Sequence, residues 1–198
     1  GTTAFQRKED WAFATYGQGV LDAARAHPER QIRLIHRQHE ASASDISATF
    51  APVIAQPNVD FVFSFKYAQA HLLSSTTQTF HRDFVRSLGD QKTLWTLRND
   101  DALMYRWGAP DFVREFFTNI PREQSAGYYY GSDMWVWGRE FLGKRPASPR
   151  QLEVNKHWLA FLLWGRLGYD PSLDNPRIAA LVGARFPGVD GAALLTAW

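Results

Sequence analysis

The sequence contains no cysteine among its 198 residues. This absence excludes disulfide bonds, thiol nucleophiles and thiolate metal sites. No apolar run approaches the roughly 20 residues of a membrane-spanning helix, so no membrane association is expected. A net charge of +2 and the lack of a long block of Lys and Arg give no reason to expect a nucleic-acid partner.

Two patterns of common enzyme classes are also missing. A G-x-G run occurs only as Gly17-Gln18-Gly19, inside a predicted helix, and is a weak match for a phosphate-binding loop. No G-x-S-x-G turn is present to support a serine nucleophile. The sequence therefore argues against a nucleotide-binding doubly wound fold and gives no support to a serine hydrolase.

Aromatic residues, by contrast, are abundant. They make up 15% of the chain and include eight Trp and 14 Phe, whereas the hydrophobic (45%) and charged (21%) shares are ordinary for a globular protein. Because aromatic rings pack against flat apolar surfaces, including the faces of sugar rings, this composition favours a planar or carbohydrate ligand.

The densest functional pattern lies in residues 126–141, A-G-Y-Y-Y-G-S-D-M-W-V-W-G-R-E-F. A tyrosine run with high strand propensity ends there at a Gly-Ser turn. Carboxylates are the usual acid and base of glycosidic cleavage, and indoles suit sugar rings. The structural alternative is that the indoles are core and that the Arg and Glu of this stretch form an ion pair. The residues after the turn are Asp133, Trp135, Trp137, Arg139 and Glu140.

Four predicted strands alternate with helices along the chain. Successive strand starts, at 31, 59, 92 and about 125, lie 28, 33 and 33 residues apart. This is the length of a βα unit and predicts an α/β fold with a parallel sheet. Strands are expected at 31–37, 59–66, 92–98 and 125–130, and helices at 10–26, 42–54, 80–88, 112–117, 148–167, 177–185 and 191–198.

Polar residues follow each predicted strand at once. The carboxyl ends of strands are where (β/α)8 (TIM) barrels place their active sites. Four βα units make half of such a barrel, so we predict that residues 1–198 form a single α/β domain, the C-terminal half of a larger catalytic barrel. The exposed edges of a half-barrel predict self-association, or a missing N-terminal half that covers them. The polar groups are His36, Arg37, His39 and Glu40; Lys66, Tyr67 and His71; Arg98, Asn99, Asp100 and Asp101; and Asp133, Trp135, Trp137, Arg139 and Glu140.

The same strand ends carry a family resemblance. The motifs I-H-R-Q-H (35–39), K-Y-A-Q-A-H (66–71), L-R-N-D-D (97–101) and W-V-W-G-R-E-F (135–141), with W-G-R-L-G-Y-D-P (164–171), resemble bacterial α-glucuronidase-type glycoside hydrolases of family 67. The resemblance implies an inverting hydrolase that removes glucuronic acid side chains from xylan fragments without a metal or other cofactor. It also implies a periplasmic or secreted location rather than a cytoplasmic one.

Carboxylates at the strand ends are the candidates for catalysis. An inverting glycosidase needs a protonated carboxyl and a carboxylate base about 6.5–9.5 Å apart. We expect Asp100 and Asp133 to be this pair, because adjacent strands could place them across one pocket. As an alternative, Asp100 or Asp101 caps the following helix, and Glu140 pairs with a cation. The further catalytic candidates are Glu40, Asp101 and Glu140.

Cations at the strand ends are candidates for binding the substrate. Arg37, Lys66 and Arg98 suit a uronic carboxylate, since a guanidinium binds it through two parallel hydrogen bonds. The alternative is that these cations pair with carboxylates of the chain itself, namely Asp60, Glu40 or Asp100. The other residues assigned to substrate binding are His36, His39, Tyr67, His71, Asn99, Trp135, Trp137 and Arg139.

Two other functions remain open at this point. His36 and His39 are expected on the same side of the strand end, where with Glu40 or His71 they could bind a metal in a metal-dependent barrel hydrolase or isomerase. A non-catalytic carbohydrate-binding module that keeps the aromatic cleft is the second alternative. Metal analysis would separate the first from a metal-free glycosidase, and Asn substitutions of the candidate carboxylates would separate the second.

Overall fold

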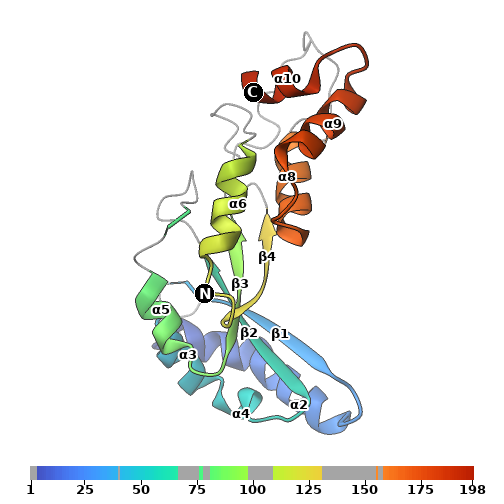
Figure 1. The fold of residues 1–198 in the computed structure, drawn as a ribbon. Helices are drawn as coiled ribbons and strands as arrows, with labels where there is room; N and C mark the ends of the chain where they lie inside the picture. The colour runs from blue at the N-terminus through green and yellow to red at the C-terminus, as the bar shows by residue number, and fades with distance from the viewer. Residues whose placement is uncertain are drawn as a thin grey trace, which may run out of the picture. The chain divides into compact units, whose positions relative to one another are not determined.

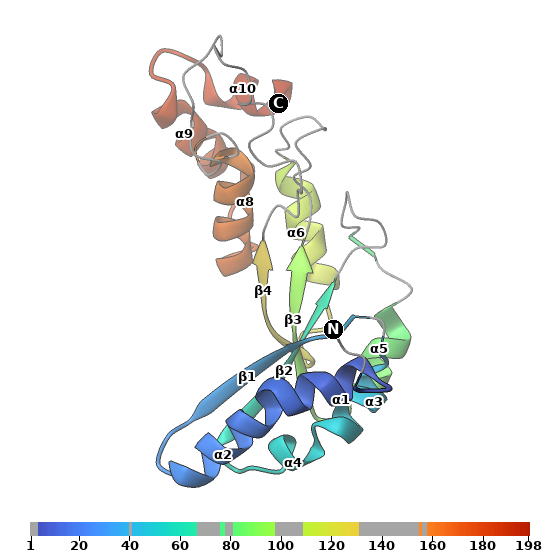
Figure 2. The same cartoon turned by 180° about the vertical axis from the view of Figure 1, so that it is seen from behind.

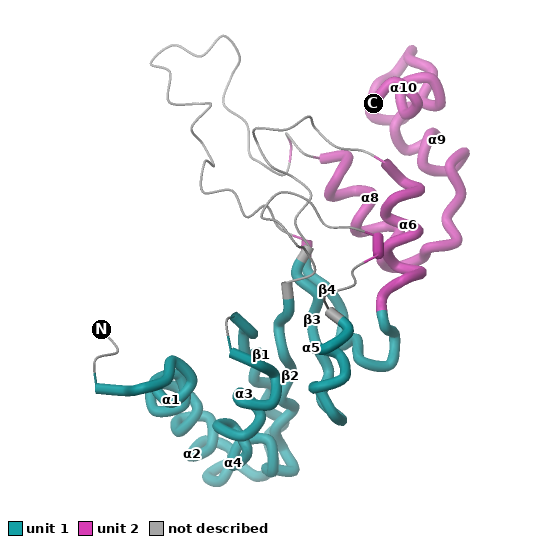
Figure 3. Tube along the Cα trace, turned by 90° about the vertical axis from the view of Figure 1, so that its left-hand side faces the viewer, with its two compact units in different colours: residues 1–67, 79–96, 121–129 teal, residues 68–78, 97–120, 130–198 magenta. Residues whose placement is uncertain are grey.

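The computed structural model describes residues 4–39, 41–66, 76–77, 81–97, 109–130, 155 and 158–198. The chain divides into two compact units (Figure 3). Unit 1 comprises residues 1–67, 79–96 and 121–129, and unit 2 comprises residues 68–78, 97–120 and 130–198. The predicted single domain over residues 1–198 stays a prediction. No helix in the described ranges is long and apolar enough to cross a membrane.

Unit 1 contains the sheet and, with the exception of the helix at Pro110–Asn119, the helices that alternate with its strands (Figure 1). The last residue of β3 and the last residue of β4 belong to unit 2. The elements in chain order are α1 (Lys8–Ala12), the π-helical segment η1 (Phe13–Gly17), α2 (Gln18–Ala26), β1 (Ile32–Arg37), α3 (Ala43–Thr49), α4 (Ala51–Ile54), β2 (Val59–Lys66), α5 (His81–Ser87), β3 (Lys92–Leu97) and β4 (Ser125–Tyr130).

The sheet has four strands in the order β1-β2-β3-β4. β1 pairs with β2 in parallel, from Ile32 opposite Val59 to Arg37 opposite Ser64. β2 pairs with β3 in parallel as well, and β3 and β4 run in the same direction (Figure 1). The α/β fold predicted from the strand spacing is confirmed, and each observed strand lies within one residue of its predicted bounds.

One face of the sheet is covered by helices and forms the core of unit 1. The alternation of β2 puts Phe61, Phe63 and Phe65 on this face. Phe61 packs 5.5 Å from Phe50, which lies between α3 and α4, and Phe65 stacks on Phe84 of α5 with ring centroids 3.9 Å apart. Figure 2 shows α1, η1 and α2 in front of β1 and β2. We call this the helix-covered face.

The helix predicted at 10–26 forms as the continuous run from α1 through η1 to α2. Its middle contains two glycines, which disfavour helix interiors. Gly17 has a packing reason, because a Cβ there would lie 2.8 Å from the Phe13 ring and 3.0 Å from the Phe50 ring. The helix therefore approaches the core so closely at Gly17 that only glycine fits there, and this explains the first of the two glycines.

The start of α3 shows how a local cap sets the boundary of a helix. Ser42 is the N-cap of α3, where its Oγ accepts a hydrogen bond from the Asp45 N–H at 3.1 Å. Ser44 and Asp45 are also good N-cap residues, but they lie inside α3 because Ser42 offers the cap earlier. The start of the helix predicted at 148–167 lies outside the described residues.

Unit 2 contains α6 (Pro110–Asn119), α8 (Trp158–Tyr169), α9 (Asn175–Arg185) and α10 (Gly191–Ala197). Its core centres on Trp164, whose ring lies 5.2 Å from Phe116 and stacks on Tyr130 at 5.3 Å. The contact between α9 and α10 requires a glycine, since a Cβ on Gly191 would lie 2.1 Å from the Ala179 carbonyl oxygen.

Candidate functional site

The second face of the sheet carries a polar cluster to which all four strands contribute. Arg37 is the last residue of β1, and its Nη1 donates hydrogen bonds to Thr96 Oγ1 of β3 at 3.1 Å and to the Tyr129 hydroxyl of β4 at 3.0 Å. Ser64 Oγ of β2 lies 3.3 Å from Thr96 Oγ1. We call these four residues the Arg37 cluster. They meet because the register places residues of neighbouring strands side by side, with their side chains on the same face of the sheet.

The cluster lies toward the carboxyl ends of the strands on a partly exposed face. Tyr129 is 45% exposed, whereas Ser64 and Thr96 are buried. Ile35, two residues before Arg37 and on the same face, is 48% exposed. The face therefore combines buried hydroxyls with a guanidinium and a phenol that solvent can reach.

Arg37 has no carboxylate partner among the described residues. Asp60, the partner considered from the sequence, pairs instead with Arg33, whose Nη2 lies 2.6 Å from Asp60 Oδ2. A guanidinium has five N–H donors. The two N–H groups on Nη1 of Arg37 donate to neutral hydroxyls. In the described part of the chain, Nε and Nη2 donate to no side chain. The guanidinium is thus held in place, and its Nε/Nη2 edge has the geometry that binds a carboxylate through two parallel hydrogen bonds.

A second polar cluster lies on the helix-covered face of the same strand. His36 and Glu9 are 3% and 4% exposed, and His36 Nε2 lies 2.8 Å from Glu9 Oε2, off the line of an ideal hydrogen bond. The Tyr16 hydroxyl lies 2.6 Å from His36 Nδ1. The Phe50 ring is 4.6 Å from the imidazole. We call Glu9, Tyr16 and His36 the buried His36 cluster.

Burial dominates the proton affinities of this cluster. It lowers the pKa of His36, against the opposing effect of the Glu9 carboxylate. Burial, reinforced by the charge of Glu9, raises the pKa of Tyr16 to about 12. A neutral imidazole that carries its proton on Nε2, toward Glu9, accepts the Tyr16 O–H at Nδ1, whereas Nε2 and Glu9 Oε2 lie close together without the geometry of a hydrogen bond. The cluster joins the N-terminal helix to the sheet.

The expected histidine pair is not formed. His36 and His39 are three positions apart, so an extended strand would point them to opposite faces, and the expectation of a shared side was wrong. His36 lies in the buried cluster, and Nδ1 of His39 lies 3.4 Å from Lys8 Nζ. In the described ranges no group of three His, Asp or Glu side chains could hold a metal. The metal alternative stays a prediction, since Glu40 and His71 are not described.

The remaining predicted site residues are mostly outside the described ranges. Lys66 is the last residue of β2, as predicted. The catalytic and substrate-binding assignments of the others stay predictions. The residues outside the described ranges are Glu40, Tyr67, His71, Arg98, Asn99, Asp100, Asp101, Asp133, Trp135, Trp137, Arg139 and Glu140.

Three members of the Arg37 cluster were missed from the sequence. Ser64 and Thr96 each stand two residues before a predicted site residue, Lys66 and Arg98, and Tyr129 lies within the tyrosine run. The period of two along a strand was the available signal, because it places these side chains on the same face as the strand-end residues. The prediction considered only the last residues of each strand and the residues that follow them.

No protein-family model and no curated protein sequence matches the chain. Among solved structures, the fold is similar to that of a GH138 enzyme targeting pectin rhamnogalacturonan II, with 18% sequence identity and a TM-score of 0.68. The match covers 94% of this chain and 22% of that enzyme, so the chain spans less than a quarter of the enzyme's length. The similar structure is thus a glycoside hydrolase, though not an α-glucuronidase of family 67, and at this identity the likeness shows a shared fold.

Proposed function

We propose that this chain is part of the catalytic domain of a glycoside hydrolase that acts on a sugar bearing a carboxylate, such as glucuronic acid on xylan. The Arg37 cluster carries the proposal. Its guanidinium is fixed by hydroxyls from two other strands, and its Nε and Nη2 donate to no described side chain. A planar carboxylate matches such an edge through two parallel hydrogen bonds. The likeness of fold to an enzyme that targets a pectic polysaccharide supports the choice of a polysaccharide substrate.

The same proposal makes the sheet part of a (β/α)8 barrel. Its strand order follows the chain, and the helices that connect β1, β2 and β3 pack on one face of the sheet, through Phe50 between α3 and α4 and through Phe84 of α5. A doubly wound sheet reverses its strand order and has helices on both faces. The Arg37 cluster lies on the other face near the carboxyl ends of the strands, which is where a barrel binds its substrate.

Hydrolysis needs an acid and a base in addition to a carboxylate receptor. We assign these roles to Asp100 and Asp133, which follow β3 and β4 in the sequence. One would protonate the glycosidic oxygen as the bond to the leaving group breaks, and the other would take a proton from the water that attacks the opposite side of the anomeric carbon. Arg37 would orient the sugar ring by its carboxylate, so that the scissile bond meets the acid and the base.

The test is the release of glucuronic acid from a glucuronic acid-bearing xylan oligosaccharide by the purified protein. Asp100→Asn and Asp133→Asn are expected to lower kcat by about a thousandfold each and to leave oligosaccharide binding within about twofold. Unchanged release in both variants would contradict the assignment. Binding of the oligosaccharide by the unaltered protein without any release would favour the non-catalytic module instead.

A further inference from the structure

Unit 2 contains a cavity of about 560 Å³ that the sequence did not predict. It lies between the N-terminal ends of α6 and α9 and the helix α10, within the size range of small-molecule sites. Its lining combines apolar side chains with a few polar ones. The residues that matter for the argument are Pro110, Asp111, Asn175, Leu195, Thr196 and Trp198.

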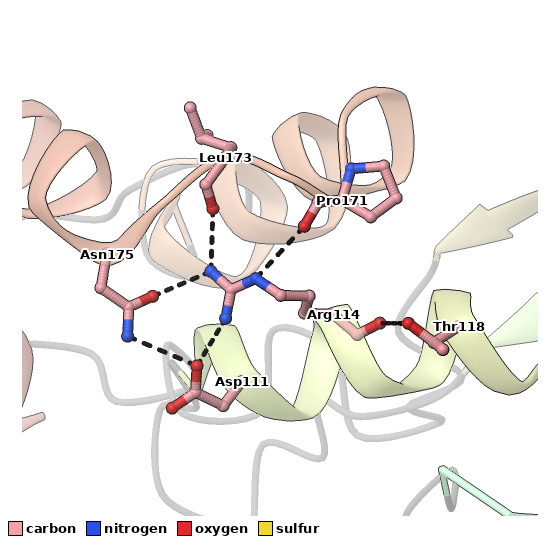
Figure 4. Close-up of polar contacts among 6 residues, drawn as sticks. All are labelled: Asp111, Arg114, Thr118, Pro171, Leu173 and Asn175. Atoms are coloured by element: carbon pink, nitrogen blue, oxygen red, sulfur yellow. Dashed lines mark hydrogen bonds and ion pairs between the residues drawn. The ribbon is translucent and has the colours of Figure 1, made fainter.

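Two polar side chains of the cavity, those of Asp111 and Asn175, are held in place by Arg114 of α6 (Figure 4). Its Nη1 donates to Asp111 Oδ1 at 2.5 Å and its Nη2 to Asn175 Oδ1 at 2.9 Å. The same guanidinium donates to the carbonyl oxygens of Pro171 at 3.2 Å and Leu173 at 2.8 Å, which ties the loop before α9 to α6. Asn175 Nδ2 lies 3.3 Å from Asp111 Oδ1. The carboxylate and the amide are therefore preorganised before any ligand arrives.

The charge of this polar edge is balanced. Arg114 neutralises Asp111, whose side chain remains 80% exposed, and Oδ2 of Asp111 is still able to accept a hydrogen bond. Such an edge accepts hydrogen bonds from hydroxyl groups without demanding a cation. It does not favour a carboxylate or a phosphate, because Asp111 Oδ2 only accepts hydrogen bonds and the Nε and Nη2 groups of Arg114 already donate within the protein.

The apolar wall is fixed as well. The ring of Trp198 lies 5.7 Å from that of Trp158 at an angle of 89°, and the Arg185 guanidinium lies 4.5 Å from the centroid of the Trp158 ring. Trp198 thus belongs to a chain of aromatic and cation–π contacts. The lining thus contains both an indole and a hydroxyl-accepting edge, and a sugar ring offers a matching apolar C–H face and hydroxyl groups.

We propose that this cavity is a second carbohydrate-binding site, one that takes a neutral sugar residue, in contrast to the carboxylate-bearing sugar assigned to the Arg37 cluster. The assignment of a sugar rests on the residues of unit 2. Its role as a second sugar site of a glycoside hydrolase rests on the proposed function. The two sites belong to different units and prefer ligands of different charge. The assignment of either site can therefore be wrong while the other holds.

The test is a titration of the ¹⁵N-labelled protein with the neutral oligosaccharide xylotetraose, followed by the indole N–H signals in NMR spectra. The Trp198 signal, assigned by its loss in Trp198→Phe, is expected to shift in a saturable way. Trp198→Ala and Asp111→Ala are each expected to weaken binding by about tenfold, because each removes one of the two recognition elements. Tyr169→Ala is the matched control, since this ring of α8 is 94% exposed and does not line the cavity.

Backbone amide spectra of every variant check that unit 2 keeps its fold. The absence of a saturable Trp198 shift would overturn the proposal, and so would unchanged affinity in both cavity variants or an equal or tighter response to glucuronic acid. Arg37→Lys separates the two sites, because it is expected to leave the response of Trp198 to xylotetraose unchanged.

Discussion

At the scale of single residues, the contrast between two arginines of β1 is the most informative feature. Arg33 and Arg37 point to the same face, four positions apart. Arg33 is neutralised by Asp60 at 2.6 Å, as expected of a solvated charged surface. Arg37 is held by two neutral hydroxyls and has no carboxylate partner in the described part of the chain. Surface ion pairs contribute little to stability, whereas a positioned cation without a partner anion is suited to bind one.

The buried His36 cluster leads to a prediction about acid stability. The pKa of His36 in the folded protein lies below its ordinary value of 6.5, mainly because of burial. Between these two values the unfolded chain binds a proton that the folded protein does not, so stability falls as the pH falls below 6.5. The charged or titratable groups that act on the imidazole are Glu9, Tyr16 and Lys8.

Urea unfolding between pH 8 and pH 5 measures this effect. His36→Gln is expected to reduce the loss of unfolding free energy on acidification, because the replacement does not titrate. His27→Gln is the control, since the side chain of His27 is half exposed and does not belong to the buried His36 cluster. Equal slopes in both variants would show that His36 does not contribute to the acid instability.

At the scale of secondary-structure elements, the two glycines of the N-terminal helical run give opposite predictions. Gly17→Ala is expected to lower the unfolding free energy by about 1–3 kcal/mol, because the new methyl group would collide with Phe13 and Phe50. Gly19 has no neighbour within 4 Å of such a methyl group. Gly19→Ala is therefore expected to raise the unfolding free energy by about 0.5–1 kcal/mol, from the better helix propensity of Ala. Thermal or urea unfolding of both variants tests the pair, and a stabilising Gly17→Ala would contradict the packing.

The elements themselves were predictable because their patterns are local. Alternating phenylalanines define β2. Gly89, at a φ of 59°, lies in the turn that follows α5, where a glycine commonly ends a helix. The position of the α3 N-cap at Ser42 was harder to predict, since several nearby polar residues can serve as a cap. The strand order within the sheet follows from right-handed connections of similar length.

At the scale of the whole molecule, the sequence predicted where a site lies better than which side chains form it. The polar residues at the strand ends included Arg37, but its two hydroxyl partners come from β3 and β4, and their positions depend on the register of the sheet. The burial of His36 depends in the same way on Glu9, which is 27 positions earlier in the chain. Contacts between distant segments are set by tertiary packing, and local patterns do not contain them. The proposed half-barrel and its self-association remain predictions at this scale.

The central claim is that the Arg37 cluster binds the carboxylate of an acidic sugar. Calorimetric titration with methyl glucuronide and with its neutral counterpart methyl glucoside tests this claim most directly. We predict that the glucuronide binds at least about tenfold more tightly, and that Arg37→Lys removes most of this preference, because an ammonium cannot make the paired hydrogen bonds of a guanidinium. Arg33→Lys, on the same strand and face, is expected to keep the preference. Equal affinity for both glycosides, or equal losses in the two variants, would contradict the account.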